Sequence, residues 1–283
     1  MFSDTFGGGN MGLFWKSTFL DRDVEAWCLE AWAWLMRCFG GVEQLRATPL
    51  VLPTADFFPP TDAVGEARGR YIFEQVRALM GMADWPCVLE AAAAPPERHR
   101  VGAYGMVNHR KSAAGTFQLY GNQARIRYAS GLEDRPRELI PVLAHELSHY
   151  RLSGARGGMP GGEELHELTT DLMVAFAGFG VFAANSASAF EQHQDAFGQG
   201  WSMRRHGYLS DRTWAFALAL FAALKGVELP REHLKPAIAD MARGAEKYLK
   251  RQPQLLEPLR AIAGGRPAED PLSAPRDCPS DRE

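Results

Sequence analysis

Residues 136–149 read PRELIPVLAHELSH, and this stretch decides most of what the sequence says about fold and chemistry. Pro136 suits the first turn of a helix, where its missing N–H costs no hydrogen bond. The apolar residues after it recur at helical spacing: Leu139, Ile140, Val142, Leu143 and Leu147. The pattern therefore predicts a helix that begins at Pro136 and packs against a core.

Within that helix, His145, Glu146 and His149 form the five-residue pattern HExxH. Helical positions four apart share a face, so both imidazoles can reach one tetrahedral ion while Glu146 points at the open coordination position. This arrangement is typical of metal-assisted hydrolysis. With 8 histidines in the chain, composition alone gives such a pattern on the order of once in a hundred sequences. The surrounding residues therefore have to show whether the pattern is a metal site or a chance match.

Those surroundings favour a metal site. The two histidines lie among Leu143, Ala144 and Leu147, which indicate a helix face turned toward the core. A buried helix does not tolerate His, Glu and His without a partner, because unpaired polar groups are costly away from water. A bound cation is the simplest partner, so the sequence predicts a metal held by both histidines.

A third ligand is expected from a second helix further along the chain. The glycine-rich segment 154–162 is predicted to be a mobile connector or a lid, since each Gly weakens a helix by about 1 kcal/mol relative to Ala. The second helix is expected to begin near Glu163 and to carry an apolar stripe as far as Phe179. Its residues with ligand chemistry are Glu163, Glu164, His166, Glu167 and Asp171. Asp171 directly precedes the uncharged stretch 172–190, where a buried carboxylate needs a partner.

HExxH followed by Glu167 and, four residues later, Asp171 resembles the gluzincin branch of the zincin metalloproteases, the thermolysin-like pattern. The resemblance covers residues 136–180. It implies that His145, His149 and Glu167 are zinc ligands, that Glu146 is the general base, and that Asp171 orients His145. A ligating imidazole usually donates its other N–H to a carboxylate, which agrees with the last role.

His166 is an alternative third ligand and would give a three-histidine site, and Asp171 is another. The extended metzincin pattern HExxHxxGxxH is absent, because Leu152 and Ala155 stand where it needs Gly and His. Ligand preferences of catalytic zinc favour Glu167.

With two His and one Glu, zinc keeps its fourth position for water and lowers the pKa of that water toward neutrality. Glu146 can then take the proton during attack on a carbonyl, which makes peptide hydrolysis the expected reaction. The oxyanion needs a second electrophile, for which His193, His206 and Tyr208 are candidates. Arg204 and Arg205 could bind a substrate carboxylate. Each of these five residues is more commonly structural or on the surface.

Short β-prone runs precede the motif helix, at 86–89, 101–107, 116–120 and 124–129. Gly121 and Asn122 suit a tight turn, which predicts a hairpin over 116–129. Helices are expected at 21–39 and 63–82, and two or three more between 211 and 259. The resulting fold class is α+β and zincin-like: a small mixed or antiparallel sheet packed on the active-site helix, with a mainly helical C-terminal half.

The 283 residues are predicted to form one zincin-like metallopeptidase domain at 13–262, between a flexible N-terminus at 1–12 and a disordered tail at 263–283. The formal net charge of -3 argues against nucleic acid as a partner. No apolar run reaches the roughly 18 to 20 residues of a membrane helix, so membrane insertion is not expected. The N-terminus lacks the features of a secretion signal, and the 4 cysteines lack metal or disulfide spacing. A cytoplasmic location is therefore expected.

The sequence thus favours a zinc-dependent metallopeptidase with Zn²⁺ as cofactor and a peptide or protein as substrate. Two alternatives stay open. The first is a zincin-like metal-binding or interaction module without turnover, and the second is a zinc hydrolase that acts on a substrate other than a peptide. They share His145 and His149 with the favoured interpretation and differ in the cleft or in the function of Glu146.

Overall fold

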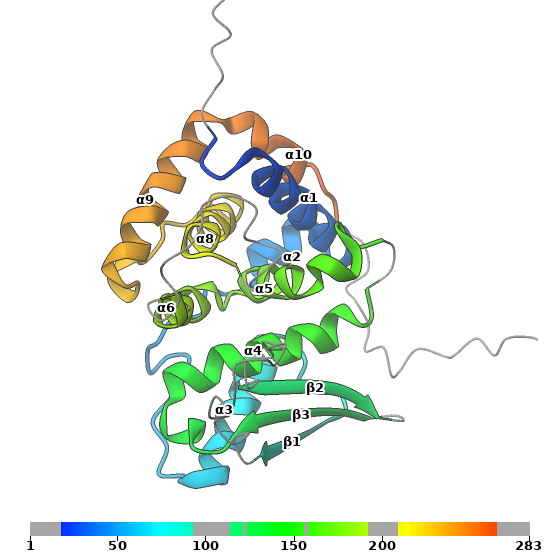
Figure 1. Ribbon diagram of the computed structural model, residues 1–283, viewed down its shortest axis with the longest axis vertical. Coiled ribbons are helices and arrows are strands. Elements are labelled where there is room, and N and C mark those ends of the chain that lie inside the picture. The colour runs from blue at the N-terminus through cyan, green and yellow to red at the C-terminus, as the bar shows by residue number, and fades with distance from the viewer. Residues whose placement is uncertain (1–17, 93–113, 121–122, 156–157, 192–208, 265–283) are drawn as a thin grey trace, which may run out of the picture.

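The protein is described by a computed structural model that covers residues 18–92, 114–120, 123–155, 158–191 and 209–264. Figure 1 shows a small sheet and α3 (Gly65–Leu79) at one end of the molecule and α4 (Pro136–Leu152) across the middle. Most of the other helices lie on the far side of α4. The segments predicted at 1–12 and 101–107, the link at 121–122 and most of the predicted tail lie outside the described residues.

Within the described residues, the sheet contains three strands, β1 (Cys87–Ala92), β2 (Gly115–Tyr120) and β3 (Gln123–Ala129), in the order β1-β3-β2. β2 pairs antiparallel with β3, as the predicted hairpin requires. β1 pairs parallel with β3, so the sheet is mixed, which agrees with the expected fold class. β1 is longer than the predicted strand at 86–89, because its partner β3 offers pairing along its whole length.

The two faces of the sheet differ in polarity. Side chains alternate along a strand, and on β3 one face buries Ala124, Ile126 and Tyr128. The opposite face carries Arg125 and Arg127, which both form ion pairs with Glu90 of β1. The buried face packs against α4 and α3, which places the motif helix directly on the sheet.

α4 begins at Pro136, as predicted, after a 3₁₀ turn, η1 (Leu132–Asp134). Its far end is held to the sheet side by Tyr150, whose hydroxyl donates to the Pro86 carbonyl at 3.2 Å. The Tyr150 ring also packs edge-on against Trp85, with centroids 4.9 Å apart. These contacts fix the end of the helix that carries the two histidines.

The predicted second helix is interrupted. The chain forms a 3₁₀ turn, η2 (Gly162–Leu165), then α5 (His166–Phe176) and α6 (Gly180–Glu191). The expectation of one helix from 163 through Phe179 is therefore wrong at both ends. Gly178 has φ +88°, and a Cβ there would lie 1.9 Å from the Pro49 carbonyl oxygen. The chain turns at this glycine because another segment passes too close for any side chain.

The glycine-rich segment 154–162 is anchored at one point in its described part. The Trp27 indole N–H donates to the Pro160 carbonyl at 3.2 Å, which links this connector to α1 (Arg22–Cys38). α1 is followed by α2 (Gly41–Ala47). The helix predicted at 21–39 is confirmed by α1, and the helix predicted at 63–82 is confirmed by α3 with slightly shorter limits.

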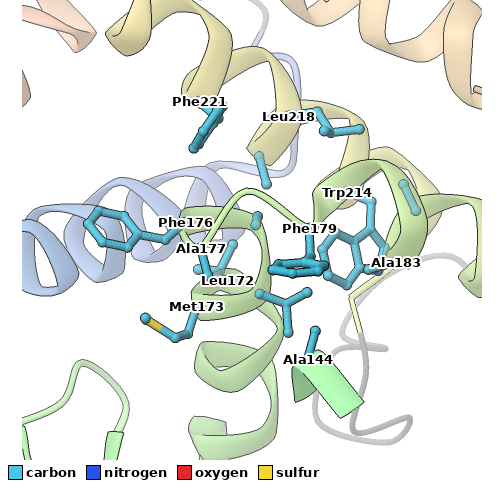
Figure 2. Packing of buried hydrophobic residues seen from close by; sticks show 14 of the residues in the cluster. Ala144, Leu172, Met173, Phe176, Ala177, Phe179, Ala183, Trp214, Leu218 and Phe221 are labelled. Carbon is cyan, nitrogen blue, oxygen red and sulfur yellow. The ribbon is translucent and has the colours of Figure 1, made fainter. Parts of the chain in front are cut away.

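The C-terminal region is helical, as expected. It contains α8 (Asp211–Lys225), η3 (Arg231–His233), α9 (Pro236–Arg251), η4 (Pro253–Leu255) and α10 (Glu257–Arg260). The Ser210 side chain caps α8 by accepting a hydrogen bond from the Thr213 amide at 3.2 Å. Figure 2 shows apolar side chains of α5, of the turn after it, of α6 and of α8 converging, among them Leu172, Phe176, Phe179, Trp214, Leu218 and Phe221. This cluster forms the core on the side of α4 away from the sheet.

Within the described residues, the helices are too short or too polar to traverse a lipid bilayer.

Candidate metal centre

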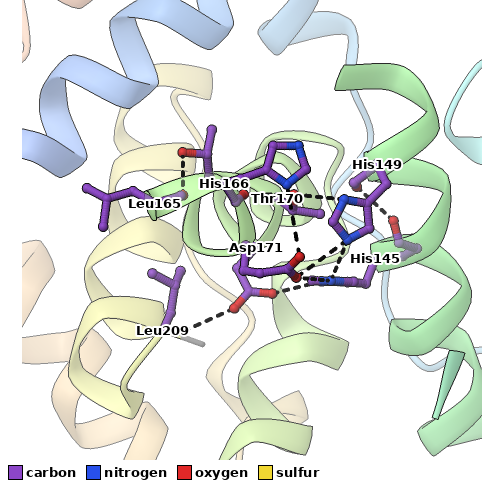
Figure 3. Close-up of polar contacts among 11 residues, drawn as sticks. His145, His149, Leu165, His166, Thr170, Asp171 and Leu209 are labelled. Carbon is purple, nitrogen blue, oxygen red and sulfur yellow. Dashed lines mark hydrogen bonds and ion pairs between the residues drawn. The ribbon is translucent and has the colours of Figure 1, made fainter. Parts of the chain in front are cut away.

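The site lies between α4 and α5, which pack side by side. α4 presents His145 and His149, which are one turn apart on one face. α5 presents Glu167 and Asp171, which are also one turn apart and come from its first half. Figure 3 shows the two histidines directed at α5 and Asp171 directed back toward His145. Glu167 lies in the first turn of α5, where the helix dipole favours a carboxylate.

Three ligand atoms form a nearly equilateral triangle. His145 Nε2 is 3.1 Å from His149 Nε2 and 3.3 Å from Glu167 Oε2, and His149 Nε2 is 3.5 Å from the same oxygen. Ligands bound to zinc at about 2.0–2.1 Å with tetrahedral angles are about 3.3 Å from one another. The three edges scatter around that value. His145, His149 and Glu167 therefore form a group that could hold a metal ion.

The outer nitrogen of His145 is paired with Asp171. His145 Nδ1 lies 3.0 Å from Asp171 Oδ1, and the other carboxylate oxygen accepts the Leu209 backbone N–H at 3.0 Å. The carboxylate is buried, with 7% of its side chain exposed. An Nδ1–H bonded to a carboxylate leaves the Nε2 lone pair free for a metal. The orientation of His145 by Asp171 agrees with the sequence prediction.

The outer nitrogen of His149 has a different partner, which sequence reasoning missed. His149 Nδ1 lies 3.3 Å from the hydroxyl oxygen of Thr170, one residue before Asp171 on α5. Two other rings lie nearly parallel to the His149 ring: Phe117 of β2 with its centroid 6.3 Å away, and His166 with its centroid 5.1 Å away. The available signal was the polar pair Thr169–Thr170, which directly precedes Asp171 on this helix.

The electrostatics of the site favour positive charge. Burial lowers the pKa of His145, but hydrogen bonds to Asp171 and Glu167 outweigh it and raise this pKa to about 10. Burial lowers the pKa of His149, and the hydrogen bond to Glu167 only partly offsets that effect. The imidazoles of His145, His149 and His166 next to Glu167 hold the pKa of its carboxyl group well below its usual range. Without a metal, the group therefore keeps a proton on His145 and stays charged on Glu167.

Glu146 is buried beside this group, with 7% of the residue exposed. Burial raises its pKa to about 7, and the nearby cationic His145 opposes this. β2 passes close to it: a Cβ on Gly115 would lie 2.8 Å from Glu146 Oε1 and 2.7 Å from a methyl group of Val142. Glycine at position 115 therefore makes room for the Glu146 side chain.

The alternative ligands occupy other positions. The described group of metal-ligating atoms contains Glu167 and not His166, whose Nδ1 lies 4.0 Å from Glu167 Oε1. Asp171 bonds the outer nitrogen of His145 instead of facing the triangle. Glu163 and Glu164 lie exposed on η2. The remaining candidates lie outside the described residues: His193, Arg204, Arg205, His206 and Tyr208.

The chain matches no protein-family profile, no curated protein and no solved structure. The resemblance to the gluzincins therefore depends on the HExxH pattern and on the geometry of the side chains around it. What the structure defines is an α+β protein with a His-His-Glu group between two helices. The identity of a metal and the zincin fold stay predictions.

Proposed function

We propose that the protein is a zinc-dependent metallopeptidase in which His145, His149 and Glu167 hold the ion. The observation that carries this proposal is the triangle of two Nε2 atoms and one carboxylate oxygen, with edges of 3.1, 3.3 and 3.5 Å. Two neutral imidazoles and a carboxylate are a donor set that catalytic zinc uses. The two Nε2 lone pairs and the oxygen would repel one another at these distances unless a cation or a proton lies among them.

When bound, zinc supplies a Lewis acid and an acidified water molecule at the open side of the triangle. Glu146 is suited to accept a proton from that water and to deliver it to the leaving amine. Its pKa of about 7 lies near neutral pH, where a general base is most effective. Glu167 is half exposed, with 51% of its side chain accessible, so the site is open to solvent and to a substrate.

A peptide substrate is supported by the position of β2. Within the described chain, β2 pairs with β3 along one edge, and no strand pairs with its other edge. Gly115 of β2 lies beside Glu146, and Phe117 stacks against His149. An extended peptide can add to an exposed strand edge through main-chain hydrogen bonds. Such pairing would carry a peptide past the general base and the two histidines.

The test is the variant Glu146→Gln, which keeps the shape of the side chain and removes its basicity. We expect full zinc content and an unchanged melting temperature, with hydrolysis of a fluorescence-quenched peptide library reduced about 100- to 10,000-fold. Glu164→Gln is the matched control, because Glu164 is an exposed glutamate on η2 and should leave activity unchanged.

Three results would overturn the proposal. One is zinc well below one equivalent in the purified wild-type chain, and another is zinc retention unchanged in the double variant His145→Ala, His149→Ala. The third is a wild-type protein with full zinc that cleaves no peptide in the library. In that case, hydrolysis of esters or other non-peptide amides would indicate a different zinc hydrolase, and its absence would indicate a binding module.

A further inference from the structure

The hydroxyl group of Thr170 bridges two groups, and its single hydrogen decides which way each bond runs. Thr170 Oγ1 lies 2.9 Å from the carbonyl oxygen of His166, one turn back on α5, and 3.3 Å from His149 Nδ1. A carbonyl oxygen can only accept a hydrogen bond, so the Thr170 hydroxyl donates its hydrogen to the backbone carbonyl of His166. The hydroxyl oxygen then has only lone pairs to offer His149, and Nδ1 must carry the hydrogen of that bond.

The rings around His149 fix its plane but not its direction. The Phe117 ring is nearly parallel to the His149 ring, with an interplanar angle of 7°, and the His166 ring stacks on it with an angle of 16°. A 180° rotation of the imidazole about its Cβ–Cγ bond keeps the ring in the same plane. It exchanges Nδ1 with Cδ2 and Nε2 with Cε1. Stacking contacts distinguish these two orientations poorly, because both present the same flat surface. A polar partner at the edge of the ring is needed to select one of them.

We infer that Thr170 is the positioning residue for His149: its hydroxyl holds the Nδ1–H tautomer and the ring orientation that turn Nε2 toward His145 and Glu167. Thr170 is fully buried, so no water competes for the bond from the exposed side of α5. The inference rests on the proposed zinc site and adds a residue to it. It gives the two histidines unlike partners, an anionic carboxylate for His145 and a neutral hydroxyl for His149.

The preceding residue supplies a matched control. Thr169 is also fully buried, and its hydroxyl donates to the Leu165 carbonyl at 3.0 Å, which is the same bond to the preceding turn. In the described part of the chain, the Thr169 hydroxyl bonds the Leu165 carbonyl, whereas the Thr170 hydroxyl also reaches a histidine of the triangle. Thr169→Val and Thr170→Val thus remove the same group from the same helix. Only the second change removes the partner of His149.

Zinc affinity is the first measurement, made on the full chain by competition with a chromophoric chelator. Loss of an outer partner of a ligating histidine typically weakens metal binding about 10- to 100-fold. We expect Thr170→Val to weaken zinc binding about 10-fold, the low end, because the lost acceptor is neutral. Thr170→Ser should restore the wild-type affinity, since serine keeps the hydroxyl, and Thr169→Val should bind zinc as wild type does.

The second measurement does not depend on bound zinc or on activity. The ¹⁵N chemical shifts and one-bond N–H couplings of the imidazoles in the metal-free wild-type protein report the tautomer of His149. We expect the hydrogen on Nδ1. In Thr170→Val, we expect the Nδ1–H signal to weaken through exchange with solvent or between tautomers, and we expect it to persist in Thr169→Val.

Two outcomes would overturn the inference: a His149 hydrogen on Nε2 in the wild-type protein, or equal losses of zinc affinity in Thr170→Val and Thr169→Val. The failure of the proposed peptidase function has a different signature. If the chain binds zinc but hydrolyses nothing, the affinities and the tautomer still test Thr170. If it binds no zinc at all, the tautomer alone decides whether Thr170 positions His149.

Discussion

The two halves of α5 bury side chains of opposite character. The first half, around Glu167 and Asp171, faces α4 with carboxylates and a hydroxyl that meet two histidines (Figure 3). The second half, around Leu172 and Phe176, packs into an apolar cluster with α6 and α8 (Figure 2). Phe176 also stands edge-on to Trp32 of α1, with centroids 5.8 Å apart.

The halves differ in what they need from the rest of the protein. Burial of apolar surface is favourable and has no preferred direction. The second half therefore stabilises the fold without requiring set distances between particular atoms. The first half places two carboxylates, one of them buried, about 3 Å from histidine nitrogens, which costs free energy unless a cation or a proton is present. We therefore expect changes in the second half to alter stability and changes in the first half to alter metal binding.

The largest expected effect comes from Phe176→Ala, which removes a side chain that is 1% exposed. We expect the free energy of unfolding, measured with urea, to fall by about 3–5 kcal/mol. Zinc affinity of the folded fraction should stay at the wild-type value, because the ring lies in the other half of α5. Val64→Ala, at a 68% exposed residue, is the control and should change stability little. A zinc affinity lowered more than tenfold would show that the two halves are coupled.

Asp171→Asn tests the polar half with a side chain of the same shape. The amide has one acceptor oxygen for the two bonds that Asp171 accepts, from His145 and from the Leu209 N–H, and it loses the negative charge. We expect zinc affinity to fall about 10- to 100-fold, with a smaller change in the urea midpoint. Asp240→Asn, whose carboxylate is exposed and pairs only with Arg243 among the recorded ion pairs, should leave zinc affinity unchanged. Equal zinc affinities for the two variants would remove Asp171 from the site.

Gly115→Ala tests how closely the sheet approaches the polar half. The added Cβ would meet Glu146 Oε1 at 2.8 Å and a Val142 methyl group at 2.7 Å, so one of them must move. We expect a stability loss of about 1–3 kcal/mol and a reduced rate of peptide hydrolysis, with zinc still bound. Gly158→Ala is the control, since nothing lies within 4 Å of its added Cβ. Unchanged hydrolysis in Gly115→Ala would mean that the position of Glu146 is not critical.

The pH dependence of zinc binding gives the smallest effect within any one pH unit, and this effect accumulates over several units. Because the pKa of His145 is raised to about 10, this residue is protonated in the metal-free protein and must release its proton to bind zinc. We expect zinc affinity to rise about tenfold per pH unit between pH 6.5 and 8.5. Calorimetry in buffers of different ionisation enthalpy should detect the released proton.

The same shifts predict the stability of the metal-free protein. A raised pKa in the folded state stabilises the fold below the unfolded pKa and loses that contribution as the pH passes the folded value. The stabilising contribution of His145 is lost between about pH 6.5 and about pH 10. The contribution of Glu146 is lost at lower pH, and this loss is complete just above pH 7. The urea midpoint of the metal-free protein should therefore fall with rising pH, and less so in His145→Gln. A midpoint that rises over this range would contradict the assigned protonation of His145.

Part of this organisation could be predicted from the sequence, and part could not. The helix at Pro136, the hairpin, and the meeting of His145 and His149 follow from local spacing, because three- and four-residue periods fix which side chains share a face. The break after Phe176 could not be predicted, since it depends on Pro49 passing close to Gly178. Nothing local in the sequence brings those two residues together.

Within the site, the sequence by itself determined which chemical groups are present. HExxH places two imidazoles on one helix face, and Glu167 and Asp171 repeat that spacing on the next helix. Only the tertiary structure decided which of these groups face one another and which bond the outer ring nitrogens. The packing of α4 against α5 and β2 sets which carboxylate oxygen faces both Nε2 atoms, and it brings Thr170 and Phe117 to His149. Distances between separate elements depend on how their surfaces pack, and no spacing along the chain encodes them.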